Sequence, residues 1–271
     1  MNLDDRRVLL TGAGSGIGRS LALHFADRAA ATVLVGRRAD PLRETARLVT
    51  ERGGSAHVLT ADLTAPSEGE RIVNDAVSAA GGLDVLVNNA GNVSAGRLED
   101  LSAADVSGML ALNLTAPILV TRAALPHLRA SGAKRGAVVL GISSGIALVG
   151  LPFYATYAAT KAGLARFDEA LGRGLTATGG HVATAYPGAT DTDMMSSNDA
   201  GEDLGFGRRP VEEVTAEIIA ALVADEPEIN TSLPSRRGMQ EQNARDPKAV
   251  TAALGARLTE LEAATRRHRS M

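Results

Sequence analysis

The sequence predicts an α/β fold: a Rossmann-type, doubly wound parallel sheet of about seven strands with helices on both faces, in a single domain. Short apolar runs alternate with helical segments over about 230 residues. The apolar runs are continuous rather than alternating in polarity, which is typical of strands covered on both faces. An eightfold α/β barrel would need eight strand–helix units, more than we count here.

The elements follow from these runs and from their turn signals. The first strand ends at Thr11-Gly12, and Asp40-Pro41 supplies an N-cap and a first-turn proline for the second helix. The predicted strands are Val8–Leu10, Thr32–Val35, Ala56–Leu59, Leu83–Val87, Ala137–Ile142, His181–Ala185 and Glu228–Thr231. The predicted helices are Ile17–Ala29, Asp40–Arg52, Ser67–Ala80, Ala103–Arg129, Ala155–Ala177 and Val211–Ala224. Residues 194–210, rich in Ser, Asn, Asp and Gly, predict a loop.

Composition excludes several kinds of site and partner. The 271 residues include no cysteine, so disulfides, zinc–thiolate sites and thiol nucleophiles are excluded. The five histidines show no metal-ligand spacing, so no metal is expected. A formal net charge of −3 gives no electrostatic case for binding nucleic acid.

Neither the start of the chain nor its long uncharged stretch predicts a membrane protein. The charged start does not resemble a signal peptide. Gly136–Thr160 has no charged residue but contains four glycines and a proline, so we expect a buried strand, loop and helix there. We therefore expect a cytoplasmic protein.

Residues 232–271 form an extension to the domain of residues 1–231. Asp246-Pro247 predicts a helix start, and an apolar stripe predicts one amphipathic helix of roughly 20 residues before Ser270. The stripe consists of Val250, Leu254, Leu258 and Leu261. Such a helix is marginal in isolation and a weak membrane anchor. We expect it to pack across the 194–210 loop or onto a neighbouring subunit.

A glycine-rich turn lies between the first strand and the first helix. Thr11–Gly18 has the spacing Gly-x-x-x-Gly-x-Gly. A strand-to-helix turn brings backbone close to a pyrophosphate, and a helix N-terminus favours its negative charge. Asn88–Gly91 and Pro187-Gly188 follow two other strands, at the edge where parallel sheets bind ligands. Together these turns predict a dinucleotide site.

With Tyr157-Ala158-Ala159-Thr160-Lys161, these segments resemble the short-chain dehydrogenase/reductase family over about residues 5–231. The resemblance implies an NAD(P)-dependent oxidoreductase, a ketoreductase acting on a carbonyl or secondary alcohol. The catalytic residues that it implies are Asn113, Ser144, Tyr157 and Lys161. The cofactor-binding residues that it implies are Gly12, Ser15, Gly16, Ile17, Gly18, Asp62, Leu63, Asn89, Ala90, Gly91, Tyr157, Lys161, Pro187, Gly188, Thr190 and Thr192. It also implies that Lys161 binds the nicotinamide ribose and that Asn113 holds a water of a proton relay.

The chemistry of the Tyr–Lys pair can be argued independently. Tyr157 and Lys161 are four residues apart on a helix, so their side chains share a face. A free phenol has a pKa near 10, and a nearby ammonium or an oxidised nicotinamide favours the phenolate. Tyr157 can then donate a proton to a developing alkoxide or accept one from an alcohol. The Ser144 hydroxyl can polarise the carbonyl.

Two alternatives concern the reaction. Tyr154 lies seven residues before Lys161, the spacing of enoyl reductases in the same superfamily. We favour Tyr154 as pocket lining or helix-start packing, and expect Ser144, Tyr154 and Met194 to contact substrate. The second alternative is a catalytically silent nucleotide-binding regulator, which would be expected to have lost part of the Ser–Tyr–Lys set.

The end of the second strand favours NADP(H) over NAD(H). NAD-specific folds usually have an acidic residue there, whereas this chain has Gly36 followed by Arg37 and Arg38. A guanidinium can bind the 2′-phosphate of NADP with its planar fork. Arg37 is the better candidate.

Partner and substrate expectations are coarser. Small residues on the helix over 155–177 favour a homodimer or homotetramer formed through that helix and the helix over 103–129. The segments 146–153 and 194–209 should shape the pocket. They carry few charges and favour an uncharged carbonyl compound over an acidic one.

Overall fold

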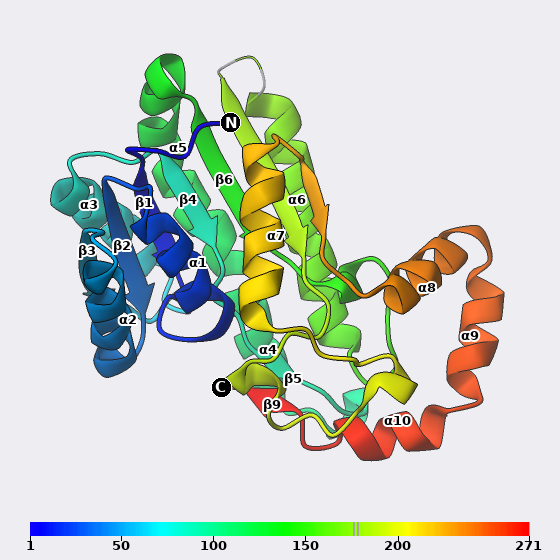
Figure 1. The fold of residues 1–271 in the computed structure, drawn as a ribbon. Helices are drawn as coiled ribbons and strands as arrows, with labels where there is room; N and C mark the ends of the chain where they lie inside the picture. The colour runs from blue at the N-terminus through cyan, green and yellow to red at the C-terminus, as the bar shows by residue number, and fades with distance from the viewer. Residues whose placement is uncertain (176, 178, 271) are drawn as a thin grey trace.

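A seven-stranded parallel sheet forms the centre of the molecule (Figure 1). The computed structural model describes residues 1–175, 177 and 179–270, with side chains omitted at 132–135. The strands are β1 Arg7–Thr11, β2 Ala31–Gly36, β3 Ala56–Thr60, β4 Val85–Asn88, β6 Ala137–Ile142, β7 Gly180–Tyr186 and β8 Glu228–Asn230. Their order is β3-β2-β1-β4-β6-β7-β8, so the chain reverses its winding between β1 and β4. A ligand crevice forms at such a reversal. The predicted doubly wound sheet is confirmed.

Two layers of helices cover the sheet. One face carries α1 Gly16–Ala26, α2 Ala39–Glu51 and α7 Val211–Val223. The opposite face carries α3 Glu68–Ala80, α5 Ala116–Arg135 and α6 Ala155–Leu175. Side chains alternate between the two cores along each strand: Val8 and Leu10 of β1 join the first core, whereas Leu9 joins the second. The uncharged stretch 136–160 is strand, loop and helix start, as predicted. The expected end of its helix includes Thr176, which lies outside the described residues.

The long helix predicted over Ala103–Arg129 is divided into three parts. α4, Ala103–Leu110, begins with a capping box between Ser102 and Asp105. A π-helical turn, Ala111–Thr115, separates α4 from α5. Such turns are often found at functional sites. Among the described residues, one helical run, Ala103–Ser131, is long and apolar enough to cross a membrane. A core helix of a soluble protein passes the same test.

The extension differs from the prediction. In place of one helix of roughly 20 residues, it contains α8 Pro234–Arg245, α9 Pro247–Gly255, α10 Leu258–Thr265 and the strand β9 Arg269–Ser270. α9 ends at Gly255, and glycine is a poor helix former. Two residues later, Arg257 donates hydrogen bonds to the carboxylates of Asp203 and Glu260. The apolar stripe is split accordingly, with Val250 buried in α9 and Leu261 buried in α10.

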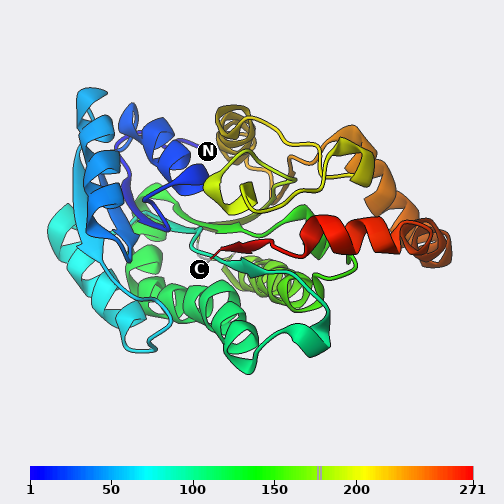
Figure 2. The same ribbon diagram turned by 90° about the horizontal axis from the view of Figure 1, so that it is seen from below.

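The extension leaves the body and returns to it (Figures 1 and 2). β9 pairs antiparallel with β5, Val93–Ser94, a short strand that the sequence did not reveal. A third hydrophobic cluster forms where the returning chain meets the loop after β7. Its buried members are Val93, Ala95, Leu151, Tyr154, Met195, Ala200, Phe206 and Leu261. The tail therefore packs on the 194–210 loop of its own chain, one of the two positions expected.

Candidate active site

A cavity of about 290 Å³ opens at the carboxyl ends of β1, β4, β6 and β7. It runs from the glycine-rich turn to the third hydrophobic cluster. The predicted residues that line it are Gly12, Ser15, Gly16, Ile17, Gly18, Asn89, Ala90, Gly91, Ser144, Tyr154, Tyr157, Lys161, Pro187, Gly188, Thr190, Thr192 and Met194. Segments far apart in the sequence thus meet at one site, as predicted from the sheet topology.

Close backbone contacts form the glycine-rich end of the cavity. Gly12 has a φ of +67°, and a Cβ there would lie 2.8 Å from the Cα of Ala90. A Cβ at Gly18 would lie 2.1 Å from the carbonyl oxygen of Gly12. Asn89 donates from Nδ2 to the carbonyl oxygens of Thr11 and Gly12, at 3.0 and 3.1 Å. The β4 turn therefore supports the β1 turn directly, and both need small residues.

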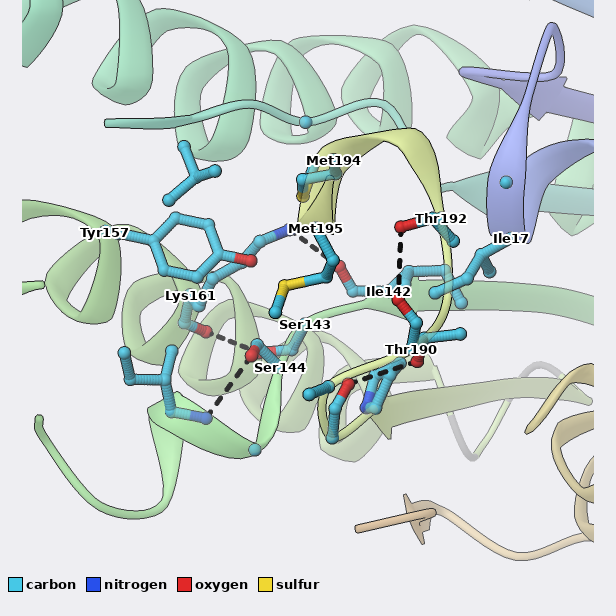
Figure 3. A pocket seen from close by; sticks show the side chains of 18 of the residues that line it. Ile17, Ile142, Ser143, Ser144, Tyr157, Lys161, Thr190, Thr192, Met194 and Met195 are labelled. Carbon is cyan, nitrogen blue, oxygen red and sulfur yellow. Dashed lines mark hydrogen bonds between the residues drawn. The ribbon is translucent and has the colours of Figure 1, made fainter. Parts of the chain in front are cut away.

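The turn after β7 forms the opposite rim. Thr190 donates from Oγ1 to the carbonyl oxygen of Gly188 at 3.1 Å, and Thr192 donates to that of Thr190 at 3.3 Å. Figure 3 shows these bonds, with Thr192 near Ile17 of the glycine-rich turn. The rim brings hydroxyl groups and exposed backbone to the first turn of α1.

Tyr157, Lys161 and Ser144 meet in the centre of the cavity (Figure 3). Tyr157 and Lys161 lie one turn apart on α6, and Lys161 Nζ is 5.9 Å from the Tyr157 ring centroid. Lys161 donates from Nζ to the carbonyl oxygen of Ile142 at 2.9 Å. Ser144 follows β6, and its Oγ accepts a 3.3 Å bond from the N–H of Ile146. The end of β6 thus positions both partners of the tyrosine.

Burial dominates the electrostatics of this group. Burial raises the pKa of Tyr157 to about 12, although its hydrogen bond with Ser144 opposes the rise. Burial lowers the pKa of Lys161 to about 8, with Asp168 opposing. The expectation that Lys161 lowers the pKa of Tyr157 is therefore wrong for the protein's own groups. The Lys161 ammonium is itself desolvated and is directed to the Ile142 carbonyl, so burial decides the pKa of the phenol.

Asn113 lies behind the cavity rather than in its lining. It is fully buried in the π-helical turn, and its Oδ1 accepts from the N–H of Asn92 at 2.8 Å. Its Nδ2 donates to the carbonyl oxygen of Asn92 at 2.9 Å and to Thr160 Oγ1 at 3.3 Å. A Cβ at Gly91 would lie 3.2 Å from Asn113 Oδ1 and 3.3 Å from Lys161 Nζ. Asn113 therefore fixes the segment that separates it from Lys161.

Four predicted cofactor residues lie away from this lining. Arg37 and Arg38 are exposed after β2. Asp62 follows β3, and its pKa is lowered by its hydrogen bonds with Thr64 and by the nearby Arg37. Leu63 is buried in the second core. The two arginines and Asp62 thus lie at the ends of adjacent strands, β2 and β3.

The far wall combines residues of the segments expected to shape the pocket with two residues that the sequence analysis missed, Arg236 and His268. Tyr154 is buried there, at the start of α6, with its hydroxyl bonded to His268 and Asn198. Phe206, Arg236 and His268 also line the cavity, together with Val93, Ile146, Leu151 and Met195. Phe206 belongs to the loop after β7, whereas Arg236 and His268 belong to the extension. No pattern in the sequence points to Arg236 or His268, because each is a single residue in a segment without a motif.

Comparison with known proteins assigns the family. The short chain dehydrogenase family model matches residues 6–203. The chain belongs to the short-chain dehydrogenase family. It is therefore an NAD(P)-dependent oxidoreductase of the kind that acts on CH–OH and C=O groups. Both Arg236 and His268 lie beyond the matched region.

Individual relatives agree with this assignment. The chain is 34% identical over 195 residues to an uncharacterised oxidoreductase of Thermotoga maritima, covering 72% of this chain and 76% of that one. It is 37% identical over 198 residues to 11-beta-hydroxysteroid dehydrogenase 1A of Arabidopsis thaliana, covering 71% of this chain but only 54% of that protein. This chain thus matches about half the length of the plant enzyme.

Solved structures share the fold. A short chain dehydrogenase of Burkholderia cenocepacia in complex with NADP has a TM-score of 0.76 and 29% identity, covering 86% of this chain and 98% of that one. A short chain dehydrogenase of Mycobacterium paratuberculosis bound to NAD has a TM-score of 0.77 at 22% identity, covering 88% of this chain and all of that one. The latter likeness concerns the fold alone.

Proposed function

We propose that this chain is an NADP(H)-dependent oxidoreductase that transfers a hydride between nicotinamide and a carbonyl or secondary alcohol, with Tyr157 as the general acid and base. The observation that carries the proposal is that one cavity is lined by the glycine-rich turn at one end and by Ser144, Tyr157 and Lys161 in its centre. A nucleotide and a small carbonyl compound can therefore lie in contact within it.

The residues present fit a dinucleotide. Gly12 and Gly18 pack on neighbouring backbone with no space for a side chain, which keeps the turn tight at the start of α1, where a helix N-terminus favours a pyrophosphate. Lys161 would hold the nicotinamide ribose, and the turn from Pro187 to Thr192 would hold the carboxamide. The cofactor supplies the hydride. Asp62 and Leu63 would contact the adenine.

Arg37 would bind the 2′-phosphate that distinguishes NADP from NAD, with Arg38 beside it. Both follow β2 and are exposed, and no acidic residue stands at the strand end. Arg37 lies near Asp62, which follows β3, and helps to lower the pKa of that carboxyl. A phosphate would place a stronger acceptor within reach of the same guanidinium.

Tyr157 would exchange the proton. Burial raises its pKa to about 12, so the phenol is protonated at neutral pH and can donate to the oxygen of a carbonyl undergoing reduction. Ser144 would bond to the same oxygen, since it already bonds with Tyr157. A water of the proposed relay would use the main chain at Asn113, because its amide is engaged with Asn92 and Thr160.

Tyr154 is poorly suited to the enoyl-reductase alternative. Its hydroxyl is bonded to His268 and Asn198, and its burial raises its pKa well above the usual range. A silent regulator is disfavoured because the full set of Ser144, Tyr157 and Lys161 lines the cavity. Tyr154 and Met194 would contact substrate instead.

The proposal includes the organisation of the chain. Residues 1–231 would form the catalytic and cofactor-binding domain, and residues 232–271 would complete its substrate side. We propose a cytoplasmic homodimer or homotetramer, joined through α4–α5 and α6. The exposed Leu110 of α4 and the partly uncovered apolar run Ala103–Ser131 support a covered face there.

The test is consumption of NADPH, followed by its absorbance, against a panel of ketones, with NADH in parallel. Turnover of at least one ketone, faster with NADPH at equal concentration, is expected. The absence of turnover with every ketone, and with secondary alcohols and NADP⁺ in the reverse direction, would contradict the proposal.

A further inference from the structure

Arg236 brings a positive charge into the substrate side of the cavity. It lies in α8, beyond the region matched by the family model, yet it lines the same cavity as Tyr157. Its Cζ is 5.3 Å from the Phe206 ring centroid. The Phe206 ring lies 5.9 Å from that of Tyr154, and the Tyr154 ring lies 6.4 Å from that of Tyr157. A wall of aromatic rings therefore leads from the guanidinium to the proposed acid.

The described residues supply Arg236 with no carboxylate. Its Nη2 donates to the carbonyl oxygen of Gly205 at 2.5 Å, and its Nη1 approaches Met239 Sδ at 3.5 Å. The adjacent Arg237 instead pairs with Glu217 at 3.2 Å. A guanidinium has five N–H donors and stays charged in proteins, so Arg236 retains donors and an uncompensated charge.

The surroundings make this charge costly. Burial lowers the pKa of Arg236, and Tyr154 is the one group that acts against the shift in the described part of the chain. Arg236 is only partly exposed, and a partly desolvated cation is normally paired because its lost hydration is otherwise uncompensated. The acidic side chain in the lining is Asp193, which is exposed and adjoins Thr192 on the cofactor rim. An anion entering the substrate side would therefore meet an unpaired arginine.

We propose that Arg236 binds a carboxylate of the substrate, so that the enzyme acts on oxo acids or hydroxy acids whose reacting carbon is separated from the carboxylate by an apolar spacer. The proposal rests on the function proposed above. The guanidinium would bond the carboxylate with its planar fork, while the oxo group lies against Ser144 and Tyr157. Leu151, Met195 and Phe206 would cover the methylenes between them.

This substrate class reverses an expectation from the sequence. The segments 146–153 and 194–209 do line the cavity with apolar groups, which favoured an uncharged compound. The charge comes from α8, some thirty residues after that loop, and contacts it at Gly205 and Phe206. This wall of the cavity is apolar except for the charge of Arg236. An oxo acid with an apolar spacer matches it, because its methylenes would contact the apolar part and its carboxylate the arginine.

A purely structural role for Arg236 makes a different prediction. If the guanidinium served only to hold the loop at Gly205, its loss would weaken every substrate alike. If it binds a carboxylate, its loss weakens acids and leaves neutral analogues unchanged. The ratio of kcat/KM for an acid to that for its methyl ester therefore separates the two roles.

The kinetic experiment uses methyl-ketone acids from levulinate upwards, one methylene at a time, each with its methyl ester and with NADPH. We expect the parent enzyme to prefer the acid at one spacer length by about ten- to hundredfold in KM. Arg236→Met should abolish that preference, and Arg236→Lys should restore part of it. Arg237→Met, which removes the neighbouring exposed arginine, should keep it. Equal use of acid and ester by the parent enzyme at every length would overturn the proposal.

A binding measurement separates this proposal from the reaction. Calorimetric titration of the NADP⁺-loaded protein with octanoate and with octanamide requires no turnover. Tighter binding of octanoate, lost in Arg236→Met, would support the anion site even if no ketone consumed NADPH, in which case the proposed reaction would fail alone. Equal binding of the two compounds, or no binding of octanoate, would refute the anion site while leaving ketone reduction intact.

Discussion

The phenol oxygen of Tyr154 and Nδ1 of His268, 114 residues apart in the chain, are 2.7 Å from each other. Asn198 donates from Nδ2 to the same phenol oxygen at 2.9 Å, so the phenol proton is directed to His268. The other ring nitrogen, Nε2, is then the donor to the carbonyl oxygen of Met194 at 3.0 Å. Burial lowers the pKa of His268, which agrees with this neutral tautomer. The last residues of the tail thus bond with the start of α6 and with the loop after β7.

Removal of the tail should impair substrate binding more than cofactor binding. Truncation after Thr265 deletes His268 and β9, which uncovers the Tyr154 hydroxyl and opens the substrate side. We expect a rise of about tenfold in KM for the carbonyl substrate, with little change in the Kd of NADPH. Steady-state kinetics and fluorescence titration measure the two.

Arg267→Ala is the matched control, because it removes an exposed ion pair with Asp199 but leaves His268 in place. Truncation after Thr231, with light scattering, removes the whole extension. Unchanged Michaelis constants and unchanged assembly mass would show that the extension contributes neither to substrate binding nor to assembly.

The two tyrosines should differ sharply in their importance. Tyr157→Phe removes the proposed proton donor and should reduce kcat by at least a hundredfold, while the Kd of NADPH stays close to that of the parent. Tyr154→Phe loses the two hydrogen bonds of its hydroxyl with His268 and Asn198 in the pocket wall and should affect mainly KM. A severe loss of kcat in Tyr154→Phe with little loss in Tyr157→Phe would instead support the enoyl-reductase arrangement.

The pH dependence should follow the protonation of Tyr157. Since its pKa is raised to about 12, from an ordinary value near 10, the phenol stays protonated through neutral and mildly alkaline pH. Reduction needs the protonated form, so its kcat/KM should stay level across this range. Oxidation needs the phenolate, so its kcat/KM should rise with pH. If reduction were lost with a midpoint near 8, the titrating group would be Lys161, whose pKa is lowered to about 8.

The choice of cofactor should depend on Arg37. Arg37→Ala removes the guanidinium expected at the 2′-phosphate, so NADPH should bind about ten- to hundredfold more weakly while NADH changes little. Fluorescence titration with both cofactors measures the ratio. Arg43→Ala is a suitable control, because Arg43 is an exposed arginine of α2 paired with Asp40. Equal losses of affinity for NADPH and NADH would show that Arg37 does not bind the 2′-phosphate.

The sheet and the glycine-rich end of the cavity were predictable because their signals are local. Continuous apolar runs specify strands covered on both faces, and Gly12 and Gly18 are required by close backbone approach. The spacing of Tyr157 and Lys161 follows from the helical repeat. Asn113 lies in a π-helical turn that directs its amide to Asn92, and this turn has no local signal in the sequence.

The segments 146–153 and 194–209 line the cavity as expected, but the part that the extension contributes could not be predicted, because it depends on long-range contacts of single residues. His268 meets Tyr154, and Arg236 meets Phe206, only after the extension has folded back. Of the apolar stripe from Val250 to Leu261, the two end residues are buried as expected, whereas Leu258 is 45% exposed. The stripe did not indicate the break after Gly255 that divides it between two helices.

The two walls of the cavity differ in how many substitutions they can accept, and the third hydrophobic cluster contributes to one of them. At the glycine-rich end, main chain packs on main chain at Gly12 and Ala90, so a side chain added at Gly12 is excluded. On the other side, the wall consists of side chains from the loop and the extension, such as Met195 and His268, which lie outside the sheet's two cores. Free-energy changes from substitutions in such separate units add nearly independently. We therefore expect substitutions in the loop and the extension to change the shape of the cavity there without disturbing the packing of the glycine-rich turn.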